Sequence, residues 1–201
     1  MSFSGEFHQA AARTIDALSS LKADWMIIGA IPVAAWGQAR ATTDAVLAAS
    51  LDFADADKLD QAALAHGLRK EKGPIEIPQK RLILSKYWDP ETSIGIDVFY
   101  TTGYVTGDFQ KQALKRKKEV TFDGRTYPIV SPEDLIVYKV LAYRQKDLDD
   151  VATVLERQFQ NLDWTYIRTW SDKLSLLALL TDVLTQYLQE QGLPIRMPWE
   201  P

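Results

Sequence analysis

The sequence predicts an α/β fold in which a sheet-forming N-terminal part is followed by a helical C-terminal part. As far as about residue 130, short apolar runs that end at turn residues alternate with helical patterns. The segment Ser131-Pro132-Glu133-Asp134 then combines a capping serine, a proline suited to the first helical turn and two acids. From there to about Gly192 the pattern is helical throughout. We therefore expect two parts, residues 1–130 and 131–201, joined at residues 128–132.

Within the N-terminal part, each element follows from a local pattern. Apolar residues at helical spacing predict a helix from about Ser4 to Leu21, and shorter helices are expected over residues 32–36 and 55–66. Asp123-Gly124 predicts the turn of a hairpin. The composition of residues 44–51 allows a strand or a helix. Apolar runs predict strands over residues 25–28, 44–51, 81–84 and 94–99.

The composition narrows the kinds of site that the chain can carry. With 201 residues, 46% of them hydrophobic, the chain can build a core, and global disorder is excluded. The absence of cysteine excludes disulfides, zinc–thiolate sites, iron–sulfur clusters and a cysteine nucleophile. Only His8 and His66 are present, too few for most zinc sites. A catalytic metal would therefore have oxygen ligands, which favours Mg²⁺.

Charge and hydropathy exclude other classes. A net charge of −4 disfavours a protein that coats long nucleic acids, although a local basic patch can still bind a phosphate-bearing ligand. No apolar run approaches the roughly 20 residues of a membrane helix. The beginning of the chain lacks a basic segment followed by an apolar one, so no signal peptide is expected. The sequence thus favours a cytoplasmic protein that does not interact with membranes.

Two patterns in the N-terminal part are candidates for chemistry. Gly29-Ala30 follows a strand and precedes a helix, where backbone N–H groups can face a phosphate, although glycine is common there simply as a turn residue. Asp44 begins one expected strand, and Asp97 lies within another, apolar strand. A carboxylate in an apolar strand needs a partner, either a metal or a structural hydrogen bond. Position 46, on the same strand face as Asp44, is valine rather than a second acid.

The charged residues of the C-terminal part allow two interpretations. Lys139 lies on the helix that follows the capping serine, and residues 144–150 read Arg-Gln-Lys-Asp-Leu-Asp-Asp. Surface ion pairs at a solvated helix end are the simpler interpretation, and phosphate binding is the second. The same two readings apply to the basic run at residues 111–118.

Taken together, these segments resemble the minimal nucleotidyltransferases of the polymerase-β-like superfamily, in particular the AbiEii-toxin-like branch. That family has a Gly-Gly or Gly-Ser turn followed by Arg-x-Thr-x-Asp-x-Asp, and here Gly29-Ala30 is followed by Arg-Ala-Thr-Thr-Asp-Ala-Val over residues 40–46. Its later motif is Ser-Pro-Glu-Asp-Leu-Ile, a lysine on the same helix, and Arg-x-Lys-Asp-x-x-Asp, matched at residues 131–136, 139 and 144–150. The resemblance covers roughly residues 22–160, and the later motif is the more specific.

The resemblance implies a mixed sheet flanked by helices and Mg²⁺-dependent transfer of a nucleoside monophosphate from a nucleoside triphosphate to an acceptor hydroxyl. Some members modify the acceptor end of tRNA as toxins, which would make tRNA or a cognate antitoxin a partner. By the resemblance, Asp44 and Asp97 would be the metal ligands. The catalytic set it implies is Asp44, Asp97, Lys139 and Asp147. The substrate-binding set it implies is Gly29, Ala30, Arg40, Thr42, Lys146 and Asp150.

Two departures from the family pattern modify this expectation. Val46 replaces the second acid, and Ala30 replaces the Gly or Ser of the phosphate turn. Because a metal site loses both a ligand and a charge with that acid, we expect weak Mg²⁺ binding. The first hypothesis is a protein that binds a nucleotide or RNA end with weak or no transferase activity. The alternatives are an active transferase in which another group, such as Asp52, replaces the missing acid, and an interaction module that shares only the fold.

Overall fold

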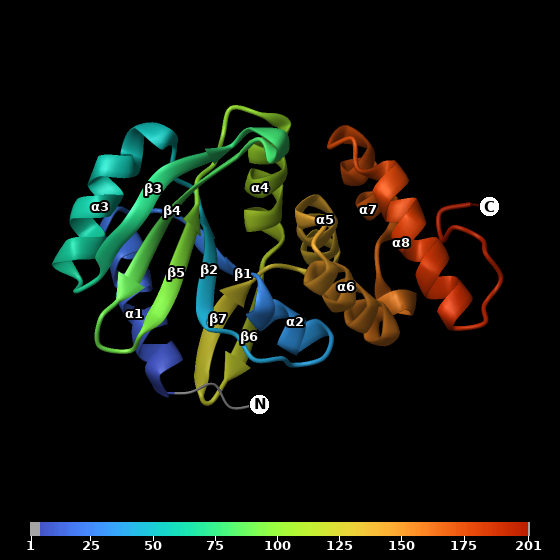
Figure 1. Cartoon of the computed structure of the whole chain (residues 1–201), viewed down its shortest axis with the longest axis horizontal. Helices are drawn as coiled ribbons and strands as arrows, with labels where there is room; N and C mark the ends of the chain where they lie inside the picture. Colours follow the sequence, from blue (N-terminus) through green and yellow to red (C-terminus); the bar gives the residue numbers. More distant parts are fainter. Residues whose placement is uncertain (1–4, 201) are drawn as a thin grey trace.

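The computed structural model describes residues 5–200, which form a single sheet with helices on both faces and a helical C-terminal part (Figure 1). The N-terminal helices are α1 (Gly5–Ser20), α2 (Ala30–Trp36), α3 (Ala56–Ala65) and α4 (Val105–Arg116). The strands are β1 (Trp25–Ile28), β2 (Asp44–Ala49), β3 (Arg69–Ile77), β4 (Leu82–Asp89), β5 (Ile94–Phe99), β6 (Lys118–Phe122) and β7 (Arg125–Ile129). The C-terminal helices are α5 (Pro132–Ala142), α6 (Gln145–Gln158), α7 (Trp164–Lys173) and α8 (Leu177–Glu190). Short 3₁₀ turns lie at Phe53–Asp55, Pro78–Lys80 and Phe159–Asn161.

The sheet has seven strands in the order β3-β4-β5-β2-β1-β7-β6. Strand β2 runs parallel to β5, and β1 runs parallel to β7. The remaining neighbours, including β1 and β2 at the centre, are antiparallel. The sheet is therefore mixed, as the family resemblance implied.

Side-chain alternation divides the sheet into two faces. On β2, Ala45 and Leu47 belong to a core cluster that includes residues of α1 and α3. Val46 and Ala48 point the other way and pack in a second cluster with residues of α4 and α5. Because Asp44 shares the parity of Val46, its side chain belongs to this second face.

The four C-terminal helices share the second core cluster with the sheet. Met26 and Ile28 of β1 lie in the same cluster as Val140 of α5 and Leu184 of α8, all at most 6% exposed. Helices α5 and α6 lie next to the sheet, and α7 and α8 lie beyond them (Figure 1). Ser131 caps α5 by accepting a hydrogen bond from the Asp134 N–H, as the capping pattern predicted.

Several expected elements are confirmed, and others differ, among them the strand expected over residues 44–51, which ends at Ala49. The strands at 25–28 and 94–99 have the predicted bounds, and residues 44–49 form a strand rather than the alternative helix. Asp123-Gly124 is the hairpin turn, with both φ angles positive. The strand predicted at 81–84 instead runs to Asp89, because its alternation continues through Ser85 and Tyr87. Strand β3 was not predicted. Ser4, the expected helix start, lies outside the described residues.

Over residues 5–200, every helix is too short or too polar to cross a bilayer.

Candidate functional site

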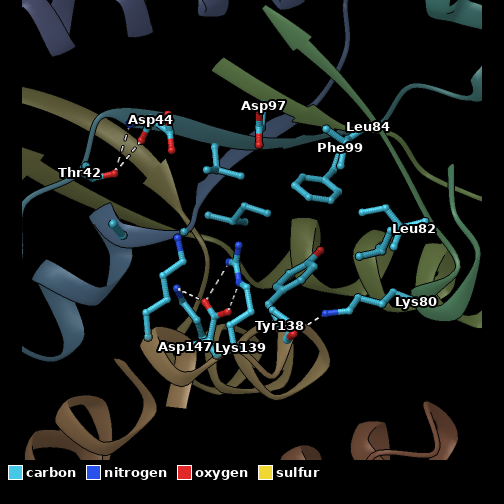
Figure 2. A pocket seen from close by; sticks show the side chains of 18 of the residues that line it. Thr42, Asp44, Lys80, Leu82, Leu84, Asp97, Phe99, Tyr138, Lys139 and Asp147 are labelled. Carbon is cyan, nitrogen blue, oxygen red and sulfur yellow. Dashed lines mark hydrogen bonds and ion pairs between the residues drawn. The ribbon is translucent and has the colours of Figure 1, made fainter. Parts of the chain in front are cut away.

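A cavity of about 430 Å³ lies between the second face of the sheet and the helices α5 and α6. The sheet and the segment that leads into β2 form one wall, and α5 with the start of α6 forms the opposite wall (Figure 2). Nine of the ten residues named above for catalysis or substrate binding line this cavity, and the tenth, Asp150, contacts two of its lining side chains. Residues that are up to 118 positions apart in sequence, from Gly29 to Asp147, thus meet at one site.

The two carboxylates of the sheet wall face the cavity together. Strands β2 and β5 are adjacent and parallel, with Asp44 opposite Gly95 and Val46 opposite Asp97. Both Asp44 and Asp97 line the cavity, which confirms their predicted placement on adjacent strands with a common cleft (Figure 2). Val46 also lines the cavity, at the position where the family pattern has an acid.

Gly29 and Val46 are in close contact at the centre of this wall. Gly29 has φ of +87°, a conformation that favours glycine. A Cβ atom on Gly29 would lie 3.1 Å from both Cβ and Cγ2 of Val46. Ala30 follows as the first residue of α2, which is only seven residues long. Position 29 therefore requires glycine for its backbone conformation and for the approach of β2.

Asp97 has a partner that sequence reasoning did not identify. The Nζ atom of Lys86 on β4 lies 2.7 Å and 2.8 Å from the two carboxylate oxygens of Asp97. The two residues are directly opposite in the antiparallel β4–β5 pair. The strand was expected to end at Leu84, which left Lys86 outside it. The available signal was the alternation of positions 82, 84 and 86, which places Lys86 on the same face as Leu82 and Leu84.

On the helix wall, a buried ion-pair network surrounds Lys139. Its Nζ atom lies 3.1 Å from Asp147 Oδ1 and 2.6 Å from Asp150 Oδ2. Arg144 donates to Asp147 at 2.6 Å, and Arg40 donates to both oxygens of Asp150 at 2.7 Å and 2.9 Å. Lys139 therefore points inward across the cavity from Asp44, as predicted, and its charge is already balanced by two carboxylates.

The network keeps its carboxylates ionised. Burial alone would raise the pKa of Asp147, but hydrogen bonds from Arg144 and Lys139 outweigh it and lower the pKa below the ordinary 3.8. Burial also acts to raise the pKa of Asp150, and its bonds from Arg40 and Lys139 lower it in the same way. Arg40 is thereby fixed to α6, which positions the segment that precedes β2.

The remaining polar residues complete the cavity. The Thr42 hydroxyl accepts a hydrogen bond from the backbone N–H of Asp44 at 3.3 Å, which shapes the entry into β2. Lys80 donates to the carbonyl of Ala142, and burial followed by the nearby Arg144 charge lowers the pKa of Lys80. Lys146 is exposed at the cavity and makes no ion pair with a described residue.

Positive charge dominates the cavity although the chain carries a net charge of −4. Three carboxylates line it, those of Asp44, Asp97 and Asp147. The basic side chains that line it are Arg40, Lys80, Lys86, Lys139, Arg144 and Lys146. Even when Asp150 is counted, two positive charges are in excess, so the cavity attracts anions.

One end of the cavity is lined mainly by apolar side chains, with Lys80 beside them (Figure 2). Leu82, Leu84 and Phe99 lie at the end away from Thr42 and Asp44 (Figure 2). Ile77 and Tyr138 also line the cavity. A ligand with an anionic group and a flat apolar group would match both ends.

The residues present do not fit a magnesium site. Over residues 5–200, no group of three or more His, Cys, Asp or Glu side chains is arranged to hold a metal. Val46 contributes no ligand, and both oxygens of Asp97 are occupied by Lys86. Asp52 is not among the described residues that line the cavity; it lies at the start of a 3₁₀ turn. Mg²⁺ in proteins is usually held by one or two carboxylates together with substrate phosphates, and of the two carboxylates on the sheet wall only Asp44 makes no ion pair with a described residue.

Comparison with solved structures shows the fold. An antigenic nucleotidyltransferase-like protein from Paracoccidioides brasiliensis matches with a TM-score of 0.50 and 16% identity, over 92% of this chain and 88% of that one. The antibiotic-resistance factor ANT(2'')-Ia, in complex with adenylyl-2''-tobramycin, matches with a TM-score of 0.53 and 12% identity, over 84% and 97% of the two chains. This chain thus has a nucleotidyltransferase fold. No protein-family model and no curated protein sequence matches it.

Proposed function

We propose that the cavity binds a nucleotide, as a free nucleoside triphosphate or as an RNA end, and that the protein transfers nucleotidyl groups weakly or not at all. The observation that carries the proposal is a cation-rich cavity with an apolar end, placed on a nucleotidyltransferase fold whose carboxylate set is interrupted. Nucleotide phosphates match the cationic part, and a base matches the apolar end.

The cationic side chains that would bind the phosphates either have no ion-pair partner among the described residues or keep unused N–H donors. Lys146 is exposed at the cavity, and Arg40 and Arg144 each use only part of their five N–H donors on Asp150 and Asp147. Gly29 leaves its backbone uncovered by a side chain at the same wall. Phe99 and Tyr138 supply aromatic surface for the base.

We expect weak or absent nucleotidyl transfer because of the charges at the carboxylates of the sheet wall. Phosphoryl displacement on this fold would rely on carboxylates that hold divalent cations beside the reacting phosphate. Here Asp97 is neutralised by Lys86, and Val46 offers no charge. A metal-dependent step at these residues is therefore disfavoured.

Binding is tested by calorimetric titration of the four nucleoside triphosphates into the full chain. At least one should bind with 1:1 stoichiometry, and Lys146→Ala should weaken binding by about two- to fivefold, the scale of an exposed charge contact. Lys118→Ala is the matched control, because Lys118 is an exposed lysine on β6 outside the described cavity lining. The absence of binding for all four nucleotides and for total tRNA would overturn the proposal.

A second candidate is an active Mg²⁺-dependent transferase. It is favoured by one observation, that Asp44 and Asp97 line the same cavity on adjacent strands. An acceptor such as a tRNA end, or a toxin–antitoxin role with a protein partner, rests on the sequence resemblance alone. Incubation with α-labelled nucleoside triphosphates, Mg²⁺ or Mn²⁺ and total tRNA decides between the two. Efficient label transfer would support this candidate and contradict weak or absent activity.

A further inference from the structure

We infer that Lys86 takes the charge-neutralising place of the divalent cation, so that the cavity binds the polyphosphate of its nucleotide in the metal-free form. This inference rests on the proposed function, since it specifies the chemical state in which that nucleotide is recognised. The group that acts is the ammonium of the Lys86 side chain at the cavity wall, and no bound ion takes part.

The sheet places Lys86 at one end of a row of opposed residues. Lys86 on β4 is opposite Asp97 on β5, Asp97 is opposite Val46 on β2, and Val46 is opposite Ile28 on β1. Gly29 follows Ile28 directly, and a Cβ atom at position 29 would lie 3.1 Å from Val46. The ammonium and the glycine turn thus lie on the same wall, with one carboxylate and one valine between them.

The ammonium retains capacity for a ligand. Lysine has three N–H donors, and the two oxygens of Asp97 account for two of them. The Lys86 side chain is 38% exposed and lines the cavity. Its third donor is therefore available to a phosphate oxygen, while Asp97 holds the long side chain in place.

The same arrangement disfavours a magnesium ion. Mg²⁺ would have to displace the ammonium from Asp97, and with Val46 in place the wall would still offer only Asp44 and Asp97, without a third protein carboxylate. A magnesium–nucleotide complex also carries less negative charge than the free nucleotide. It would bring a hydrated dication into a cavity in which positive charges already exceed negative ones.

We therefore expect Mg²⁺ to weaken the binding of ATP to the native chain rather than strengthen it. We expect ATP to bind the native chain at least about threefold more tightly in EDTA than in excess Mg²⁺, the scale of one exposed charge contact. Lys86→Met should weaken binding of ATP in EDTA about tenfold or more, as expected for loss of a charge-assisted hydrogen bond. Because Lys86→Met frees Asp97, Mg²⁺ should then strengthen ATP binding instead of weakening it.

Calorimetry with ATP as the probe, with EDTA or with excess Mg²⁺, measures both effects on the full chain. Lys118→Met is the matched control for loss of one lysine charge, and Lys86→Arg should retain tighter binding in EDTA. Tighter binding of the magnesium form by the native chain would overturn this inference and leave the proposed function standing. Failure of ATP, the other nucleotides and total tRNA to bind in either buffer would overturn the proposed function itself. The comparison on the native chain does not depend on the folding of any variant.

Discussion

At the residue scale, Val46 and Lys86 together separate this cavity from a carboxylate metal site. Each acts on Asp97 from a neighbouring strand: Val46 withholds a second acid, and Lys86 occupies the acid that remains. Each of the two therefore weakens divalent-cation binding beside Asp44, and removing both should strengthen it most.

A pair of variants tests this coupling. Val46→Asp alone should strengthen Mn²⁺ binding only slightly, because Lys86 still neutralises Asp97. Val46→Asp combined with Lys86→Met presents three carboxylates and should bind Mn²⁺ at least about tenfold more tightly than the single variant. Electron paramagnetic resonance titration of free Mn²⁺ measures both affinities. An equal gain in the single and double variants would show that Lys86 does not control the site.

Gly29 provides a residue-scale prediction about stability. Gly29→Ala should lower the free energy of unfolding by about 1–3 kcal/mol, because it combines a strained positive φ with a close contact to Val46. Gly124→Ala is the control, since Gly124 also has a positive φ but open space around a new Cβ. Urea unfolding should show a larger loss at position 29. Equal losses would mean that the contact with Val46 contributes nothing.

At the element scale, the pairing of α5 with α6 depends on a buried cluster of charges. Lys139 on α5 is held by Asp147 and Asp150 on α6, and both acids have pKa values below 3.8. Since the folded-state pKa values are depressed, the stabilisation is complete above the ordinary pKa and is lost as the pH falls through the folded-state values.

Asp150→Asn tests this pH dependence. At pH 7 the substitution should reduce the free energy of unfolding by about 3 kcal/mol, because Lys139 and Arg40 lose a charged partner. The difference from the native chain should begin to shrink below pH 3.8, where Asp150 takes up a proton in the unfolded chain, and should disappear as the pH falls through the lower pKa of Asp150 in the folded chain. Asp149→Asn, at an exposed neighbouring position, should change stability little at either pH. Urea unfolding at pH 7 and pH 3 measures both variants, and a pH-independent loss at Asp150 would contradict the ion-pair account.

The elements differ in how far the sequence could predict them. Strands β1 and β5 are short apolar runs between turn residues, so their bounds followed from local pattern. Strand β2 is rich in alanine, and only its pairing with β1 and β5 decides against a helix. Strand β3 is an edge strand with mostly exposed or half-buried residues, including Arg69 and Lys70, so it lacks the apolar alternation that marks a strand.

The candidate site, too, could be predicted from the sequence only in part. Asp44, Asp97 and Lys139 could be assigned to one cleft because their segments resemble the motifs of the nucleotidyltransferase family, which implies that these residues meet at one site. The pairing of Lys86 with Asp97 depends on the register of β4 against β5, which no local pattern specifies.

At the scale of the whole molecule, the sheet and the C-terminal helices share one core. Leu184 of α8 is fully buried in the cluster that contains Met26 and Ile28 of the sheet. Leu184→Ala should lower the free energy of unfolding by about 2–5 kcal/mol, because it leaves a cavity in this core. Because the two parts share this core, they should unfold in one transition. Tryptophan fluorescence reports on both parts, since Trp25 lies on β1 and Trp170 lies on α7, and its transition should coincide with that seen by far-ultraviolet circular dichroism. Two separated transitions would instead show that residues 1–130 and 131–201 unfold independently.

The most direct test of the account is a crystal structure of the native chain grown with ATP and MnCl₂, with data collected at the manganese absorption edge. The account predicts ATP in the cavity, with its phosphates beside Gly29 and Lys86, and no anomalous peak between Asp44 and Asp97. A manganese peak that bridges those two carboxylates, or ATP bound elsewhere on the molecule, would contradict it.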